Sequence, residues 1–164
     1  MKPALMIIDV QKAFFGDPTT TQSLNDAIET INAAIALFRE KHLPIVSVQH
    51  VDENSMLVPG EERFELPDEL AVLPSDLHIR KTYSNAFNKT PLGDELRKLG
   101  VDTVIVTGFC AEYCVLAAHQ GALDVDLTPI TLRGALASST PENITFVENI
   151  TNIISYQALA RVLE

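Results

Sequence analysis

The chain has 164 residues, of which 46% are hydrophobic and 21% charged, as in a folded domain rather than a disordered segment. Lys and Arg total 12 against 22 Asp and Glu, so the net charge is −10. Because nucleic acids and anionic membranes attract clusters of Lys and Arg, this balance argues against both as partners. No apolar run approaches the roughly 20 residues that span a bilayer, and Asp9 comes too early for a secretory signal, so we expect a cytoplasmic protein.

Strands and helices are predicted to alternate along the chain. Residues 4–10 form a short apolar run that is typical of a strand, and apolar side chains spaced three and four apart predict a helix over 24–38. After Pro44, residues 45–50 read as the second strand. Residues 52–76 are rich in proline and acidic residues, so we predict a long loop with a short helix near 68–71.

The second half of the chain continues the same alternation. Thr90 and Pro91 predict a helix start, and Gly100 predicts its end. The other predicted elements are strands at 77–83, 102–108 and 124–132, helices at 111–121 and from Thr140, and a final strand or helix at 154–163. Such alternation implies βαβ units. The predicted fold class is therefore α/β: one domain, residues 1–164, forming a three-layer α/β/α sandwich with a mostly parallel, Rossmann-like sheet of five to six strands.

Three chemically active residues lie at or just after the carboxyl ends of predicted strands, where open parallel sheets bind their ligands. Asp9 is either a structural cap or a buried carboxylate held for proton transfer. Lys81 alone would most often be a solvated lysine, and an isolated cysteine is usually inert. Cys114, however, is predicted at a helix N-terminus, which lowers a thiol pKa below its free value of about 8.5. Together, the acid, the cation and the thiol would form an activated nucleophile with its base and charge partner.

Three segments carry a resemblance to a known family, and the last of them, "GALDVDLTPITLRGALASS", is similar to the strand that follows the family's nucleophile helix. "LMIIDVQKAFF" is similar to the family's opening strand, and "IRKTYSNAFNKTPLGDELRKLGVDTVIVTGFCAEYCV" is similar to its lysine block and nucleophile turn. The family is the isochorismatase-like cysteine hydrolases, which include nicotinamidases, N-carbamoylsarcosine amidohydrolases and ureidoacrylate amidohydrolases. The matching blocks follow one another in the family's order over nearly the whole chain.

The resemblance implies a mechanism and a set of catalytic residues. Asp9 would be the base, Lys81 the charge partner and Cys114 the nucleophile of a hydrolase that cleaves an amide or carbamoyl C–N bond of a small molecule through a thioester. A cis peptide bond would join Phe109 to Cys110. The backbone amides of Cys110 and Cys114 would then form the oxyanion hole. Relatives usually form dimers or tetramers, so a homo-oligomer is also expected.

The resemblance also leaves open which residues bind substrate and whether a metal is present. The nicotinamidase branch has an Asp-x-His metal motif after its second strand, but here Val48 stands two residues before His50, so we predict no catalytic metal and no cofactor. His50 is instead a candidate pocket residue. The full set of candidate substrate-binding residues is Gln11, Phe14, His50, Phe87, Phe109 and Tyr113.

Two other functions remain open at this point. The first is isochorismatase-type hydrolysis of a vinyl ether, in which an acid protonates carbon and the thiol is dispensable. The second is a redox role for Cys110 and Cys114, although their C-x₃-C spacing differs from the C-x-x-C of thioredoxins and no further Cys or His pair completes a zinc site.

Overall fold

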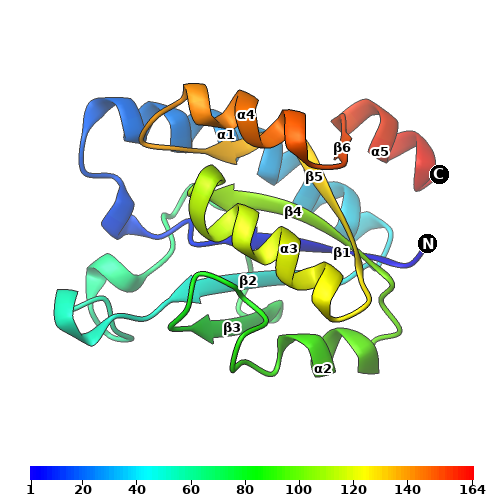
Figure 1. Cartoon of the computed structure of the whole chain (residues 1–164), viewed down its shortest axis with the longest axis horizontal. Helices are drawn as coiled ribbons and strands as arrows, with labels where there is room; N and C mark the ends of the chain where they lie inside the picture. Colours follow the sequence, from blue (N-terminus) through cyan, green and yellow to red (C-terminus); the bar gives the residue numbers. More distant parts are fainter.

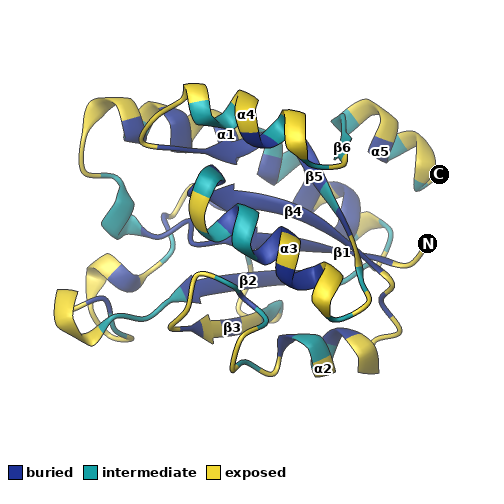
Figure 2. Cartoon of the chain, viewed as in Figure 1, coloured by how far each residue is buried: buried dark blue, intermediate teal, exposed yellow.

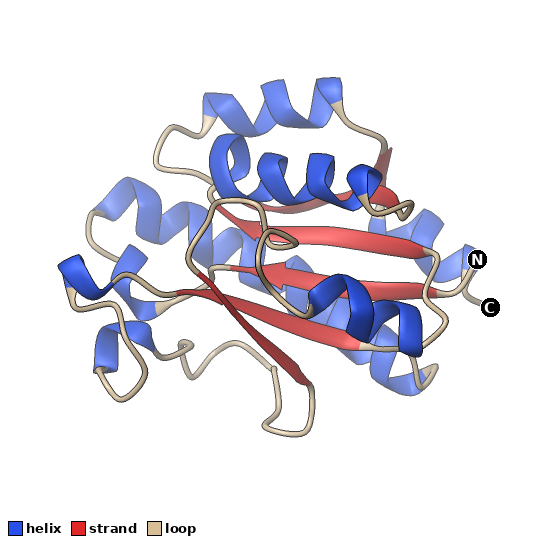
Figure 3. Cartoon of the chain, turned by 60° about the horizontal axis from the view of Figure 1, so that its bottom comes forward, coloured by secondary structure: helices blue, strands red, loops and turns tan.

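The computed structural model describes residues 1–164, and six strands form the sheet at its centre. Figures 1 and 3 show helices on both faces of this sheet. The strands lie side by side in the order β3-β2-β1-β4-β5-β6, and every neighbouring pair is parallel. The predicted three-layer α/β/α fold is confirmed. The strand bounds are β1 Pro3–Ile8, β2 Ile45–His50, β3 Leu77–Lys81, β4 Thr103–Phe109, β5 Thr128–Ala137 and β6 Ile153–Ile154.

Five α-helices supply the two outer layers, and four shorter helical turns lie in the segments that follow β1, β2 and β4. The helices are α1 Pro18–Glu40, α2 Leu92–Lys98, α3 Leu116–Asp124, α4 Glu142–Ile150 and α5 Tyr156–Val162. The turns are the 3₁₀ segments η1 Lys12–Phe14, η2 Glu53–Ser55 and η3 Glu62–Phe64, and the π-helical segment η4 Ala111–Val115. None of the helices combines the length and the apolar character that a membrane span requires.

The strand β1 is buried on both faces because its side chains alternate between two apolar cores. Leu5 and Ile7 belong to the core that also contains the buried residues of α1 and α5. Met6 and Ile8 belong to the core under α2, α3 and α4. Figure 2 shows the consequence: the central strands are buried, and exposed residues lie on the outer faces of the helices. Such a sheet holds the ends of its central strands in fixed positions.

Several predicted element boundaries differ from the structure, each for a local reason. Helix α1 begins at Pro18, ahead of the apolar stripe, because the Asp17 side chain accepts a hydrogen bond from Thr20 N at 3.0 Å and caps the helix. Strand β5 begins at Thr128 and runs on to Ala137, with its pairing to β4 shifting register between Val106 and Gly108. The short helix expected near 68–71 is a turn, and the 52–76 segment contains η2 and η3 instead.

Gly108 allows β4 to pass close to β1 next to the functional edge of the sheet. Its φ is +115°, and an added Cβ would lie 2.1 Å from the carbonyl oxygen of Ile8. Both the left-handed backbone and the overlap disfavour any side chain here. We expect Gly108→Ala to lower the free energy of unfolding by about 3 kcal/mol or more, measured by urea denaturation. Gly16→Ala is the control, since nothing lies within 4 Å of its added Cβ; equal stability of the two variants would contradict the expectation.

Candidate functional site

The structure brings Asp9, Lys81 and Cys114 together at the carboxyl-terminal edge of the sheet. Asp9 follows β1, Lys81 ends β3, and Cys114 lies in η4 directly after β4. In Figure 1 the arrowheads of these strands point to the same end of the molecule. Lys81 Nζ lies 2.8 Å from Asp9 Oδ2 and 3.4 Å from Cys114 Sγ. Asp9 and Lys81 are each only 1% exposed, whereas Cys114 is partly exposed. An ion pair thus lies beneath a thiol that solvent can reach.

The end of β1 places the carboxylate of Asp9 by a local change in backbone direction. Asp9 has a φ of +52°, and its N–H donates to Val48 O of β2 at 2.9 Å. An aspartate tolerates this left-handed conformation better than most residues. Its Oδ2 accepts from Lys81, while Oδ1 is buried without a partner. A buried carboxylate oxygen without a donor is a natural acceptor for a proton from a neighbouring group.

Gln11 supports the site from behind rather than facing it. It is 0% exposed, and its side-chain Nε2 donates to His50 O and to Phe64 O, both at 3.1 Å. Its Oε1 accepts from His50 N at 2.8 Å. Because its amide is committed to these backbone groups, Gln11 has no free donor to offer a ligand, and it holds the end of β2 next to the η3 turn.

The electrostatics of the three side chains keep the thiol protonated. Burial raises the pKa of Asp9 above its ordinary value, and the Lys81 ammonium opposes that rise. Burial, and then the Asp9 charge, raise the pKa of Cys114 to about 11, against the opposing effect of Lys81. The direction is opposite to the lowered thiol pKa expected from the sequence, because desolvation and the neighbouring carboxylate outweigh the Lys81 ammonium. At neutral pH, this sulfur needs a base before it can attack.

The turn between β4 and Cys114 has the backbone geometry that the resemblance implies. The Phe109–Cys110 peptide bond is cis. The carbonyl of Cys110 accepts from Tyr113 N at 3.0 Å and from Val115 N at 3.2 Å, which closes η4. The amide of Cys110 donates to no group within the protein. An unused backbone N–H thus precedes the turn that carries the thiol.

Glu112 anchors this turn to the segment that follows β5, a feature that the sequence did not indicate. Its carboxylate accepts from Ser138 Oγ at 2.8 and 2.9 Å, from Asn143 Nδ2 at 2.9 Å and from Cys110 Sγ at 3.1 Å. Ser138 is fully buried, and its Oγ also accepts from Thr140 N at 2.9 Å. These hydrogen bonds hold η4 in place. Their donors lie far from Glu112 in the sequence, so the spacing of residues around Glu112 does not predict them.

Removing the Glu112 carboxylate should loosen the turn. Burial raises the pKa of Glu112, but hydrogen bonds led by that from Asn143 outweigh it and leave the pKa below its ordinary value. A carboxyl group whose pKa is lower in the folded than in the unfolded state stabilises the fold at pH values above its unfolded-state pKa. This stabilisation is lost as the pH falls through the folded-state pKa. We expect Glu112→Ala to lower the free energy of unfolding by about 1–3 kcal/mol at pH 7 and by less at pH 3, in urea denaturation.

The exposed Glu142→Ala on α4 is the matched control for Glu112→Ala, because Glu142 is a neighbouring carboxylate with no side-chain hydrogen bond of its own. It should leave the stability within about 0.5 kcal/mol of the wild type. If Glu112→Ala behaved in the same way, the anchoring role would be contradicted.

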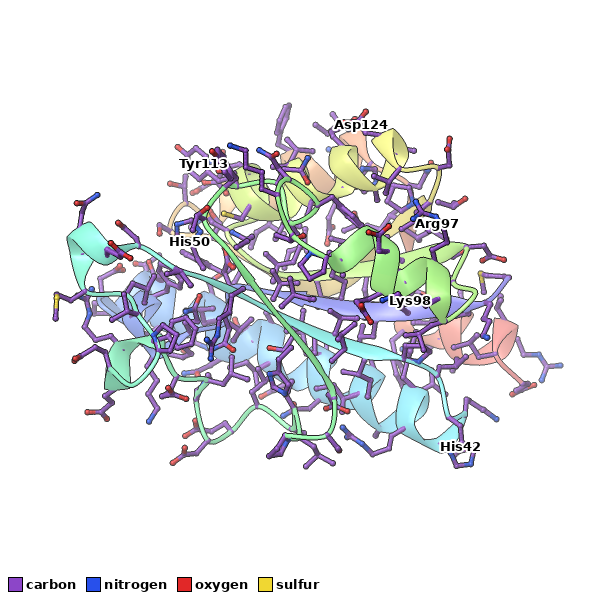
Figure 4. The ribbon with its side chains drawn as sticks, turned by 90° about the horizontal axis from the view of Figure 1, so that it is seen from below. His42, His50, Arg97, Lys98, Tyr113 and Asp124 are labelled. Carbon is purple, nitrogen blue, oxygen red and sulfur yellow. The ribbon has the colours of Figure 1, made fainter.

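The aromatic candidates lie in three different environments. The rings of Phe14 and Phe109 pack 4.8 Å apart against the core under α1. Phe87 packs against the opposite core, and Tyr113 is 68% exposed. Figure 4 shows Tyr113 and His50 at the same end of the molecule, away from His42. The structure therefore does not gather all four aromatic side chains into one wall.

Neither a metal site nor a thiol pair fits the residues at this edge. His50 Nδ1 lies 3.1 Å from the Lys81 ammonium, and a metal ion at this nitrogen would have to displace that cation. Val48 occupies the position at which the nicotinamidase branch has a metal-binding aspartate, and its side chain is fully buried. No group of three His, Cys, Asp or Glu side chains converges as metal ligands do. Both cysteines are free, and their sulfurs face different partners: Glu112 for Cys110 and Lys81 for Cys114.

A well-formed surface hollow lies away from this cluster. It has a volume of about 590 Å³ between α1 and α4, lined by residues such as Pro18, Gln22 and Ile144, and contains none of the three clustered side chains. The cluster reaches solvent instead through Cys114 and His50, which are both partly exposed. A ligand of the cluster would therefore approach from the side of these two residues.

Comparison with known proteins gives a consistent result. The family model described as "Isochorismatase domain" matches residues 3–156. The isochorismatase family protein YrdC of Bacillus subtilis is 29% identical over 92% of this chain and 82% of its own length. Streptothricin hydrolase of Streptomyces noursei is also 29% identical, over 73% of this chain but 48% of its own length. The crystal structure of N-carbamoylsarcosine amidase from Thermoplasma acidophilum superposes with a TM-score of 0.82 at 25% identity, covering 94% of this chain and 96% of that one.

Proposed function

Because this chain belongs to the isochorismatase family, we propose that it is a hydrolase that uses Cys114 to cleave the C–N bond of a small amide or carbamoyl compound. In this proposal Asp9 is the base, Lys81 is the charge partner, and the amides of Cys110 and Cys114 bind the oxyanion. The observation that carries it is the position of Lys81 Nζ, which contacts both the carboxylate of Asp9 and the sulfur of Cys114.

The proposed reaction begins with transfer of the thiol proton to Asp9. The sulfur attacks the carbonyl carbon, and the negative charge that develops on the carbonyl oxygen is stabilised by the two backbone amides. Asp9 then returns its proton to the nitrogen as the C–N bond breaks, so that ammonia or an amine leaves and a thioester remains. Water, deprotonated by Asp9, attacks the thioester and regenerates the Cys114 thiol. The raised thiol pKa supports this sequence, because a protonated sulfur requires a base.

The relatives' names support the choice of bond. An N-carbamoylsarcosine amidase is one of the structures that superpose along nearly the whole chain, and a streptothricin hydrolase is among the sequence relatives. The first name is that of an amidase, and both are hydrolases. Since the chemistry of a fold depends on its site, the bond that this chain cleaves needs a direct test.

The proposal is tested by trapping the thioester. The enzyme would be screened for ammonia release from small primary amides and ureido compounds, with hydroxylamine added as a competing nucleophile. We expect an acyl group on the Cys114 peptide after an acid quench, seen by mass spectrometry, and a hydroxamate product from hydroxylamine. Hydrolysis with an unmodified Cys114 and no hydroxamate would overturn the proposal.

One observation favours a second candidate, the acid-catalysed hydrolysis of a vinyl ether. Burial raises the pKa of Asp9, and a protonated carboxyl is the group that such a reaction needs. Cys114→Ala separates the two functions, since it should remove amide hydrolysis but leave cleavage of isochorismate intact. Loss of both activities in that variant would exclude a vinyl-ether hydrolysis that proceeds without the Cys114 thiol.

A further inference from the structure

The three contacts of the Lys81 ammonium determine where protons lie in the cluster. An ammonium group has three N–H donors and no acceptor, so every hydrogen-bond partner must accept. The partners of Lys81 Nζ are Asp9 Oδ2 at 2.8 Å, Cys114 Sγ at 3.4 Å and His50 Nδ1 at 3.1 Å. All three donors are thereby used. His50 Nδ1 must then be the unprotonated nitrogen of the imidazole, and Nε2 carries the hydrogen.

The position of the imidazole is fixed as well as its tautomer. The buried Gln11 side chain accepts from the backbone N–H of His50 at 2.8 Å and donates to its carbonyl at 3.1 Å. The end of β2 is therefore held on one side by Gln11 and on the other by Lys81. Burial and the Lys81 charge lower the pKa of His50, against the opposing effects of Asp9 and Asp52, which keeps the ring neutral. A donor that is already oriented loses little freedom when it binds a ligand.

The Nε2–H of His50 is the free donor of this cluster. It has no hydrogen-bond partner in the protein and is not among the buried atoms without one. The ring is half-buried and this N–H is not sealed from solvent. Figure 4 shows His50 at the same end of the molecule as the exposed Tyr113. The cluster of Asp9, Lys81, Cys114 and His50 carries no net charge. The charges of the Asp9 carboxylate and the Lys81 ammonium cancel, and the thiol and the imidazole are neutral. A substrate carboxylate would find no unpaired cation among them.

We propose that His50 is a substrate-binding residue whose Nε2–H donates to an uncharged acceptor, such as a second carbonyl oxygen, beside the scissile amide. The substrate class is then a small neutral amide with a second acceptor, rather than an amide that bears a carboxylate. This inference rests on the proposed function for the identity of the reacting group. The tautomer itself rests only on the hydrogen bonds of Lys81.

Two substitutions separate this role from a purely structural one. In His50→Asn, the side-chain oxygen can replace Nδ1 as the acceptor for Lys81, but no N–H reaches the outer position. In His50→Gln, the longer side chain can place an N–H at the outer position, but it leaves Lys81 without its inner acceptor. Each variant thus keeps one half of the function of the imidazole.

The binding test uses Cys114→Ser protein, in which a hydroxyl keeps an acceptor for Lys81, and three probes of similar size. Malonamide has a neutral second carbonyl, malonamate has a carboxylate, and butanamide has no second acceptor. We expect malonamide to bind about 3- to 10-fold more tightly than the other two, as for one neutral hydrogen bond. His50→Asn should abolish the preference for malonamide over butanamide, and His50→Gln should retain most of it. The reverse order of the two variants, or equal binding of the three probes, would overturn the inference.

A second measurement examines the tautomer without any ligand. In ¹⁵N NMR spectra of histidine-labelled protein at neutral pH, the His50 signals, assigned by their loss in His50→Asn, should be those of a neutral ring protonated at Nε2. A ring protonated at Nδ1, or at both nitrogens, would overturn the inference. This measurement does not depend on hydrolysis, so it tests the tautomer independently of the proposed function.

Discussion

Replacing Cys114 with alanine is expected to lower the kcat/KM for amide hydrolysis by at least about 10⁴-fold, because no other nucleophile lies at the Asp9–Lys81 pair. The thiol is partly exposed, so the variant should remain folded. The measurement is ammonia release from the best neutral amide, with circular dichroism as the check on folding. A variant that kept a tenth of the wild-type activity would contradict the assignment of the nucleophile.

Cys110→Ala is the matched control, since it removes the other thiol of the chain. Its Sγ donates to Glu112 at 3.1 Å, but the proposed contribution of Cys110 to catalysis comes from its backbone amide, which alanine retains. We expect a loss of activity of less than about 10-fold, because Glu112 keeps its hydrogen bonds from Ser138 and Asn143. A loss as large as that of Cys114→Ala would show that the two cysteines act together.

Replacing Lys81 with methionine should produce the largest effect on stability. The side chains of Lys81 and Asp9 are 0% and 2% exposed, so the substitution leaves a buried carboxylate without its counter-ion. Breaking a buried pair in this way costs about 3–5 kcal/mol. Hydrolysis should also be lost. The free energy of unfolding is measured in urea at several pH values, where an effect of less than 1 kcal/mol at pH 7 would contradict the importance of the pair.

The pH dependence of this variant has a defined sign. In the wild type, burial raises the pKa of Asp9 and Lys81 opposes the rise, so removing Lys81 moves that pKa further up. A carboxyl with a raised folded pKa stabilises the fold below its unfolded pKa and loses this contribution as the pH rises through the folded value. Lys81→Met should therefore be less destabilising at pH 3 than at pH 7. Adding Asp9→Asn should recover stability at pH 7 but not hydrolysis.

The sequence predicted the sheet and the meeting of the catalytic candidates because both follow from regular patterns. Residues 45–50 form β2 as expected, since Pro44 and an apolar run mark its limits. The carboxyl ends of parallel strands share one edge, which is why Asp9, Lys81 and Cys114 could be placed together before any coordinates. Their separations of 2.8 and 3.4 Å from Lys81 Nζ agree with that placement.

The features that the sequence did not predict depend on tertiary contacts. The pKa of Cys114 moves in the opposite direction from that expected because burial and Asp9 outweigh the effect of Lys81. Gln11 was expected at the substrate, yet its amide binds backbone groups of distant segments. The anchoring of Glu112 depends on Ser138 and Asn143, which lie 26 and 31 residues away in the chain. No periodicity or motif encodes such pairings.

The proton relation between Asp9 and Cys114 is tested most directly by the pH dependence of Cys114 alkylation by iodoacetamide, followed by peptide mass spectrometry, in the wild type and in Asp9→Asn. Since the carboxylate raises the pKa of the thiol, which is about 11 in the wild type, we predict a lower thiol pKa and faster alkylation at neutral pH in the variant. Amide hydrolysis should nevertheless fall by about 10²- to 10⁴-fold, because the base is absent. A thiol pKa that is unchanged or higher in Asp9→Asn, or hydrolysis that persists, would contradict this relation.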